Sequence, residues 1–422
     1  MSATDEIERV ARLSHGRLVA ILASRTGNVT AAMDALSDAV DRELEVWPVQ
    51  GVPARPEGWL IATARHRAAD AGRTAARAAA AAEALTLMEE ERMDMGHAAT
   101  PDRILNLMFV CAHPAIEARM RTPLMLQLVL GLDARRMAGA FLIAPGTLGQ
   151  RLTRARAKIE AARIGFALPD GDELAPRLAN VLDAVYAAFT VGIDGEGAGD
   201  AKSTSLAREA LWLGSLIAAQ MPEASEAQAL FALMLYTQAR RPARVDGSGC
   251  LIPLDEQDTS LWDARMMADA DLALRLAAGA PTLGRYQIEA AIAAAHADRR
   301  HGHPTNWGAI AGLYRGLAAL HPTTGALTGL AAALGEAGDP AAGLTVFDAA
   351  DATHAAAYQP WWAVRAHLSA LAGASGQAIA CYDRAIALCP DPAARAFLER
   401  KKANLRSSCL ADLPRDFSST SD

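Results

Sequence analysis

Polar and basic side chains recur at helical spacing between residues 145 and 161. Thr147, Gln150, Arg151, Arg154 and Lys158 fall on the side opposite the apolar set Leu148, Leu152, Ala155 and Ile159. Short polar side chains can hydrogen-bond to base edges, and Arg and Lys bind phosphates. Residues 134–163 hold seven Lys/Arg against one acid, Glu160. The spacing therefore predicts an amphipathic helix that reads duplex DNA through its basic side.

A tight turn and a short helix precede this stretch. Asp133 can cap the first helix, and Met137 and Phe141 lie four residues apart on its inner side. Residues 143–146 break the pattern, and Pro145 stands where a helix can begin. A solvated helix face would show the same charge pattern. The turn, the short helix and the concentration of charge favour a helix-turn-helix with its recognition helix at 145–161.

Other residues that could do chemistry form no complete site. Cys111 with His113, and His301 with His303, are pairs of ligands without the second pair that a tetrahedral zinc site needs. Asp246, Glu256 and Asp258 are carboxylates with no nucleophile tied to them, so capping and pairing with nearby arginines is the simpler interpretation. Phosphate-loop, nucleophile-elbow and zinc-protease motifs are missing. We therefore expect no enzyme, no cofactor and no metal.

Composition predicts an all-α protein. The chain has 422 residues, 51% of them hydrophobic, and alanine runs through nearly every segment. The apolar stretches are too short for a membrane span, and the acidic N-terminus does not resemble a signal peptide. Five scattered cysteines suit reduced thiols, so a cytoplasmic location is expected.

Charge is distributed unevenly along the chain. Residues 1–165 hold 21 Lys/Arg and 19 Asp/Glu, whereas residues 166–422 hold 20 and 29. The net charge of −7 thus hides a basic region in the first third. That region is the part able to meet a phosphate backbone.

The helical patterns predict two small helical domains followed by a large one. The first domain covers 1–78, with helices up to 47, a Pro-rich loop at 48–56 and a third helix from 57 to 73. A linker at 79–102 leads to a second small domain at 103–165 that ends in the helix-turn-helix. Residues 172–406 form the large domain, and a disordered tail is expected at 407–422.

The large domain ends in weakly repeated helical hairpins. Residues 326–334 and 342–350 flank a Gly-Asp-Pro turn, and residues 356–372 and 377–388 flank a Gly-Ala-Ser-Gly turn. The segment 380–390 has the Tyr, Ala and Pro placement of a tetratricopeptide helix. Before these repeats, residues 240–253 form the one long irregular stretch, with a Gly-rich turn at 247–249. A tetratricopeptide-like stack is therefore expected.

Taken together, these segments resemble a bacterial extracytoplasmic-function sigma factor of RNA polymerase, in the subgroup with a long helical, tetratricopeptide-like C-terminal extension. The resemblance covers nearly the whole chain. It includes Arg-Pro-Glu-Gly-Trp-Leu-Ile-Ala-Thr-Ala-Arg-His-Arg-Ala-Ala-Asp at 55–70 and Leu-Asn-Leu-Met-Phe-Val-Cys-Ala-His-Pro-Ala at 105–115. The remaining matches are at 28–47, 116–159, 239–246, 256–258, 262–263, 284–287 and 358–361.

The resemblance implies partners and roles for particular residues. Asp34, Asp38 and Asp41 would bind the clamp of core RNA polymerase. Arg65, His66, Arg67 and Arg73 would hold the melted minus-10 strand of promoter DNA. The helix 145–161 would read the minus-35 element, through Thr147, Gln150, Arg151, Arg154 and Lys158. The extension would regulate activity in cis, through an intramolecular contact or a protein partner, and no membrane is involved.

Two alternatives stay open at this stage. The chain could be a helix-turn-helix regulator that binds duplex DNA without polymerase, although the acidic helix and the Pro-rich loop count against this. It could also be a tetratricopeptide-like interaction scaffold with a vestigial N-terminal third. The sparse arginines after the third helix, Arg73 and Arg77, keep the scaffold open as an alternative.

Overall fold

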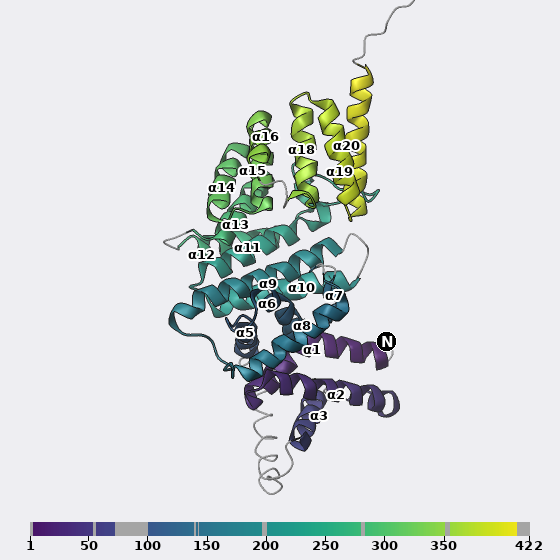
Figure 1. Ribbon diagram of the computed structural model, residues 1–422, viewed down its shortest axis with the longest axis vertical. Helices are drawn as coiled ribbons and strands as arrows, with labels where there is room; N and C mark the ends of the chain where they lie inside the picture. Colours follow the sequence, from purple (N-terminus) through teal and green to yellow (C-terminus); the bar gives the residue numbers. More distant parts are fainter. Residues whose placement is uncertain are drawn as a thin grey trace, which may run out of the picture. The chain divides into compact units, whose positions relative to one another are not determined.

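The computed structural model describes residues 3–53, 56–71, 100–138, 141, 143–195, 201–279, 283–350 and 355–411. Over these residues the protein is all-α, as predicted from composition (Figure 1). Among these residues, β-type pairing is limited to an isolated antiparallel bridge between Val245 and Leu251. The chain divides into two compact units. Unit 1 comprises Met1–Val191 and Leu206–Gln220, and unit 2 comprises Gly192–Ser205 and Met221–Asp422. The domain boundaries expected from the sequence stay predictions.

Unit 1 starts with three packed helices, α1 (Ala3–Thr26), α2 (Val29–Gln50) and α3 (Pro56–Ala71). Asn28 caps α2, because its side chain accepts a hydrogen bond from the backbone N–H of Ala31 at 3.0 Å. The rings of Trp47 and Trp59 meet edge to face at 5.6 Å and join α2 to α3. Glu57 joins α3 to α1 by accepting from Arg17 at 3.0 Å.

The next helices of unit 1 are α5 (Thr100–Cys111), α6 (Ala118–Leu130), α7 (Ala134–Ala138) and α8 (Pro145–Ala161). The first helix of the chain, α1, packs against both α5 and α6. Gly16 permits this approach, because a Cβ atom at that position would lie 2.1 Å from the carbonyl oxygen of Val129 on α6. The helices of residues 3–71 and those of residues 100–161 thus belong to unit 1.

Two further helices, α9 (Leu174–Gly195) and α10 (Ala201–Gln220), place most of their residues in unit 1. The buried guanidinium of Arg177 on α9 donates to the carbonyl oxygen of Phe109 on α5. Arg121 on α6 donates to the amide oxygen of Asn180 on α9 at 3.2 Å. These bonds attach α9 to α5 and α6.

Unit 2 continues with α11 (Ser225–Ala239), α12 (Ala264–Ala277), α13 (Arg285–Ala297) and α14 (Trp307–Leu320). Glu226 on α11 accepts from the backbone N–H groups of Tyr286 and Gln287, each at 3.0 Å, and so caps α13 from another helix. Tyr236 on α11 donates to Asp271 on α12 at 2.5 Å, and Arg300 pairs with the same carboxylate. Short 3-10 turns connect these helices: η3 (Arg241–Ala243), η4 (Thr259–Leu261) and η5 (Asp298–His301).

The C-terminal helices of unit 2 form antiparallel hairpins, as the repeats predicted. α15 (Thr324–Glu336) pairs with α16 (Pro340–Ala349), and α18 (Gln359–Leu371) pairs with α19 (Ser375–Leu388) (Figure 1). Asp339 caps α16 by accepting from the N–H of Ala342 at 2.9 Å, directly before Pro340. The last helix, α20 (Pro392–Ala411), packs on α19 and continues beyond residue 406, where the sequence pattern had suggested a tail.

One helix end differs from the prediction. The Pro-rich loop was expected to begin at residue 48, but α2 runs through Pro48 to Gln50. Proline costs a backbone hydrogen bond inside a helix. The neighbouring side chains of Glu45, Val49 and Gln50 are exposed, so water can satisfy the freed carbonyl group.

Candidate nucleic-acid interface

α7 and α8 lie where the sequence predicts the two helices of a helix-turn-helix, and they pack against each other. Asp133 caps α7 by accepting from the N–H of Arg136 at 2.9 Å, as predicted. α8 begins with Pro145 at its first position, where the missing N–H has no partner in any case. The four residues predicted to face inward are the buried residues of α8, namely Leu148, Leu152, Ala155 and Ile159. α8 is therefore anchored through one apolar stripe on α6 and α7.

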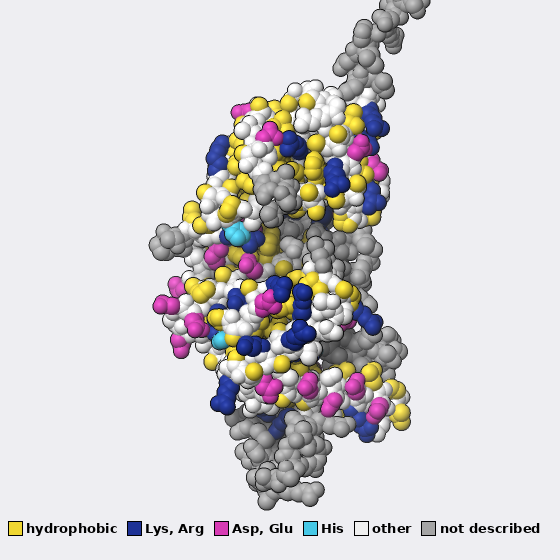
Figure 2. Space-filling view, viewed as in Figure 1, with side chains coloured by type: hydrophobic (Ala, Val, Ile, Leu, Met, Phe, Trp, Pro, Cys, Tyr) yellow, Lys and Arg dark blue, Asp and Glu magenta, His cyan; other side chains and the backbone are white. Residues whose placement is uncertain are grey.

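The opposite side of α8, which we call its polar face, carries the residues predicted to meet DNA. Thr147, Gln150, Arg154 and Lys158 are exposed, and Arg151 is half-buried. Figure 2 shows basic side chains gathered over α8. On α7, the exposed Arg135 and Arg136 add two more cations in the same unit. The structure thus brings all five residues onto one helix side that can be reached from solvent.

One flank of α8 packs against the start of α2, a contact that sequence reasoning missed. The hydroxyl group of Thr30 donates a hydrogen bond to the carbonyl oxygen of Arg156 at 3.3 Å. Asn28 donates to Glu160 at 3.2 Å, and the guanidinium of Arg156 lies 3.9 Å from the sulfur of Met33. Arg156, counted among the basic residues of this region, therefore faces α2 and not the polar face.

The three acids expected to bind polymerase share one exposed side of α2. Asp34, Asp38 and Asp41 are spaced four and three residues apart, which places them on adjacent turns. Figure 2 shows acidic side chains in a row along this helix, beside the basic side chains over α8. Each of the three carboxylates is accessible to a large partner.

A fourth acid of α2, Glu43, is fully buried. Its two carboxylate oxygens have no hydrogen-bond partner, and neither does the indole N–H of the buried Trp47. Burial raises the pKa of Glu43 to about 7. The signal was present in the sequence, because Glu43 continues the helical stripe of Ala32, Leu36 and Ala39 that ends at Trp47.

The residues expected to hold a melted strand are only partly placed. Arg65 is half-buried on α3. His66 and Arg67 belong to the same helix, but their side chains lie outside the described residues, as does the whole of Arg73. The structure therefore groups the residues on α8 and those on α2, and leaves the grouping of Arg65 with His66, Arg67 and Arg73 as a prediction.

Within the described part of the chain, no cluster of His, Cys, Asp and Glu could hold a metal ion. Cys111 is buried, and burial raises the pKa of its thiol well above the usual range. The nearby His113 accepts from the N–H of Ala115 at 3.1 Å, which is a turn contact. No helix among the described residues is long and apolar enough to cross a membrane.

Comparison with known proteins finds similarity to a family of unknown function and to an uncharacterized protein. Residues 177–278, from α9 to the end of α12, match a family of unknown function (DUF6596). An uncharacterized protein of Rhizobium meliloti (strain 1021) is 33% identical over 386 residues, which cover 90% of each chain. No solved structure matches the chain. Because the identity extends over nearly the full length of both proteins, the chain belongs to the same family as this Rhizobium meliloti protein.

Proposed function

We propose that the protein is a sigma factor, which binds core RNA polymerase and directs promoter-specific initiation of transcription. The observation that carries the proposal is α8. Its apolar stripe is buried on α6 and α7, and four of the five residues of its polar face are exposed, with Arg151 half-buried. A recognition helix needs this division, because one side must be held by the protein while the other enters the major groove.

The order of side chains along α8 supports recognition of duplex DNA. Thr147 and Gln150 lie in the first turns, where a recognition helix comes nearest to base edges. Arg154 and Lys158 follow at intervals of four residues and suit phosphate contacts along the groove. On this proposal the helix reads the minus-35 element.

The exposed acids of α2 supply the surface for polymerase. Asp34, Asp38 and Asp41 would meet a basic patch on the clamp, which favours association and fixes its orientation. Arg65 and the residues that follow it would bind the melted minus-10 strand. Unit 2 would act as a regulatory extension in cis, and the protein would work in the cytoplasm.

The decisive experiment combines polymerase capture with transcription in vitro. Purified full-length protein is mixed with bacterial core polymerase and with the DNA upstream of its own gene, and run-off transcripts are measured. We expect stoichiometric binding and discrete transcripts. Asp38→Arg should weaken polymerase binding and leave duplex affinity intact, whereas Arg151→Glu with Arg154→Glu should abolish specific transcripts and leave polymerase binding intact.

The outcomes separate the competing functions. Duplex binding without polymerase binding would favour a helix-turn-helix regulator that acts alone. If the unmodified protein binds neither duplex DNA nor polymerase, an interaction scaffold would be favoured. Transcription that survives both sets of substitutions would overturn the assignment of these residues.

A further inference from the structure

The irregular segment between α11 and α12, residues 240–263, is held by hydrogen bonds within itself and from η5. Asp246 accepts from the N–H groups of Ser248 and Cys250 at 2.9 Å and from the hydroxyl of Ser248 at 2.6 Å. Arg299 donates to the carbonyl oxygens of Leu254 at 2.6 Å and Gln257 at 3.2 Å. Long irregular segments are uncommon in compact units, because each of their buried backbone N–H and C=O groups needs its own hydrogen-bond partner. Where such a segment is ordered, it usually serves a function.

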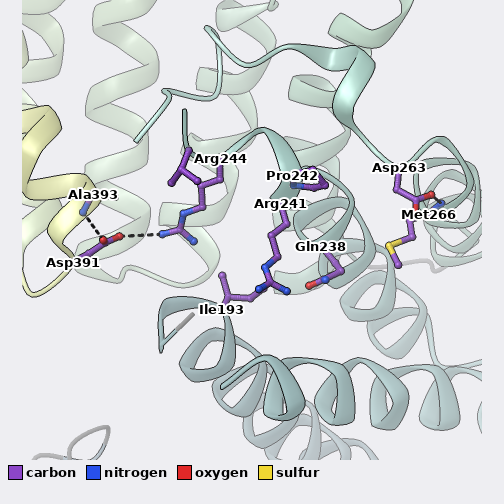
Figure 3. Close-up of a pocket in the computed structure, with 10 residues that line it drawn as sticks. Ile193, Gln238, Arg241, Pro242, Arg244, Asp263, Met266, Asp391 and Ala393 are labelled. Carbon is purple, nitrogen blue, oxygen red and sulfur yellow. Dashed lines mark hydrogen bonds and ion pairs between the residues drawn. The ribbon is translucent and has the colours of Figure 1, made fainter. Parts of the chain in front are cut away.

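A cavity of about 520 Å³ lies in unit 2 against the first residues of this segment. Arg241, Pro242, Arg244 and Val245 line it from one side, and Asp391 and Ala393 line it from the start of α20. Figure 3 shows Arg244 extending toward Asp391 and Arg241 extending toward Ile193. The size falls within the range of sites for small organic molecules.

The two carboxylates at the cavity are already engaged by groups of the protein. Asp391 accepts from the N–H of Ala393 at 2.9 Å and pairs with Arg244 at 3.6 Å. Asp263 caps α12 by accepting from the N–H of Met266 at 2.9 Å. A bound cation would therefore compete with existing donors at both carboxylates.

The guanidinium groups favour an anion instead. A guanidinium carries five N–H donors arranged to bind carboxylate or phosphate in pairs, so it can bind more than one acceptor. Arg241 and Arg244 come from the same short stretch as Arg240, so three positive charges lie within five residues. The acid next to them, Asp246, accepts three hydrogen bonds from its own turn, all at Oδ1.

The rest of the lining suits an apolar body with one polar acceptor nearby. Pro242, Val245, Met266 and Ala393 present apolar surface. The amide oxygen of Gln238 is buried without a hydrogen-bond partner and belongs to the same lining. A ligand with an apolar body and a hydroxyl or N–H group would satisfy that oxygen.

We infer that this cavity binds a small organic oxyanion, a carboxylate or phosphate ester on an apolar body, with Arg241 and Arg244 holding the charge. The inference goes beyond the proposed sigma factor and does not depend on it. It gives the region shared with the family of unknown function a ligand-binding role, because Arg241, Arg244, Asp263 and Met266 all fall within residues 177–278.

The test uses the full chain and three ring compounds of similar size: benzoate, phenyl phosphate and the neutral benzamide. Methionine methyl groups are labelled with carbon-13, and the Met266 signal is assigned with Met266→Leu. We expect one of the anions to shift the Met266 signal with a Kd on the order of 1 mM, and benzamide to bind at least about tenfold more weakly. The tighter anion identifies the charged group.

Two variants locate the site, and one controls for charge. Arg241→Gln should lower the affinity for the anion about tenfold or more, because a charge-assisted hydrogen bond is lost. Val245→Trp should block binding by filling the cavity, and this position tolerates bulk because Val245 is 45% exposed. Arg315→Gln removes the same charge from an exposed position on α14 and should leave binding unchanged.

Three results would overturn the inference. The first is an unshifted Met266 signal with both anions up to saturating concentrations. The second is equal affinity for benzamide and benzoate. The third is binding that neither Arg241→Gln nor Val245→Trp reduces. Circular dichroism of each variant shows whether the fold is kept, and Val245→Trp alone suffices if Arg241→Gln unfolds.

Discussion

Removing two cations from the polar face of α8 should change how DNA affinity depends on salt. On the proposed function, Arg154 and Lys158 bind phosphates, since both are exposed and lie beyond the first turns of α8. Each phosphate contact contributes about 0.9 to the slope of log affinity against log salt. The double substitution Arg154→Gln with Lys158→Gln should therefore flatten that slope by about 1.8.

The size of this effect is easily measured. When salt rises from about 50 to about 200 mM, the affinity of both proteins for the duplex falls. With a slope difference of about 1.8, the fall is about twelvefold smaller for the variant than for the unmodified protein. The assay is fluorescence anisotropy with a labelled duplex from the upstream DNA, titrated at several potassium chloride concentrations. Gln150→Ala should leave the slope unchanged and lower the preference for that duplex over an unrelated one.

A matched variant controls for net charge. Arg315→Gln with Arg406→Gln removes two exposed cations from α14 and α20 of unit 2 and should keep the original slope. If the α8 variant and this control show the same salt slope as the unmodified protein, Arg154 and Lys158 do not contact phosphates. The assignment of the polar face to DNA would then be wrong.

The remaining predictions concern the packing that supports the site. Gly16→Ala should lower the free energy of unfolding by about 3 kcal/mol or more, because its Cβ would lie 2.1 Å from a backbone oxygen of α6. By contrast, Gly149→Ala should raise it by about 1 kcal/mol, because the added methyl would meet only Ala134 at 3.8 Å and alanine favours the helix. Urea unfolding followed by circular dichroism measures both, and equal effects would contradict the packing of α1 on α6. Glu43 holds its proton more tightly in the folded state, where its pKa is about 7, than in the unfolded chain. Its contribution to stability is therefore fully present below its usual pKa of 4.5 and is lost as pH rises through 7. Glu43→Gln should remove this pH dependence of unfolding, and an unchanged dependence would show that another group causes it.

The sequence pattern was sufficient for the local structure of α8. The helical spacing of Leu148, Leu152, Ala155 and Ile159 predicted its buried side, and Pro145 predicted its start. Both features depend on neighbouring residues alone, since one apolar stripe and a terminal proline define an amphipathic helix. The hairpins of unit 2 were predictable for the same reason, from their turn residues and apolar repeats.

Contacts between distant segments were not predictable from those patterns. Arg156 looks like one more surface cation in the sequence, and only the packing of α2 on α8 turns it toward Met33. The cavity beside Arg241 and Arg244 likewise depends on Asp391 and Ala393, which lie about 150 residues later in the chain. The continuation of α2 through Pro48 depends on solvent at its exposed end, which local propensity does not describe.

The contact between α2 and α8 has a thermodynamic consequence. Thr30, Asn28 and Met33 join the helix proposed to bind polymerase to the helix proposed to bind DNA. If either partner changes this contact on binding, the affinities for the two partners are linked. Linkage is reciprocal, so polymerase would change the affinity for duplex DNA by the same factor by which duplex DNA changes the affinity for polymerase. Three side chains at the start of α2 would then set how strongly promoter recognition depends on the enzyme that uses it.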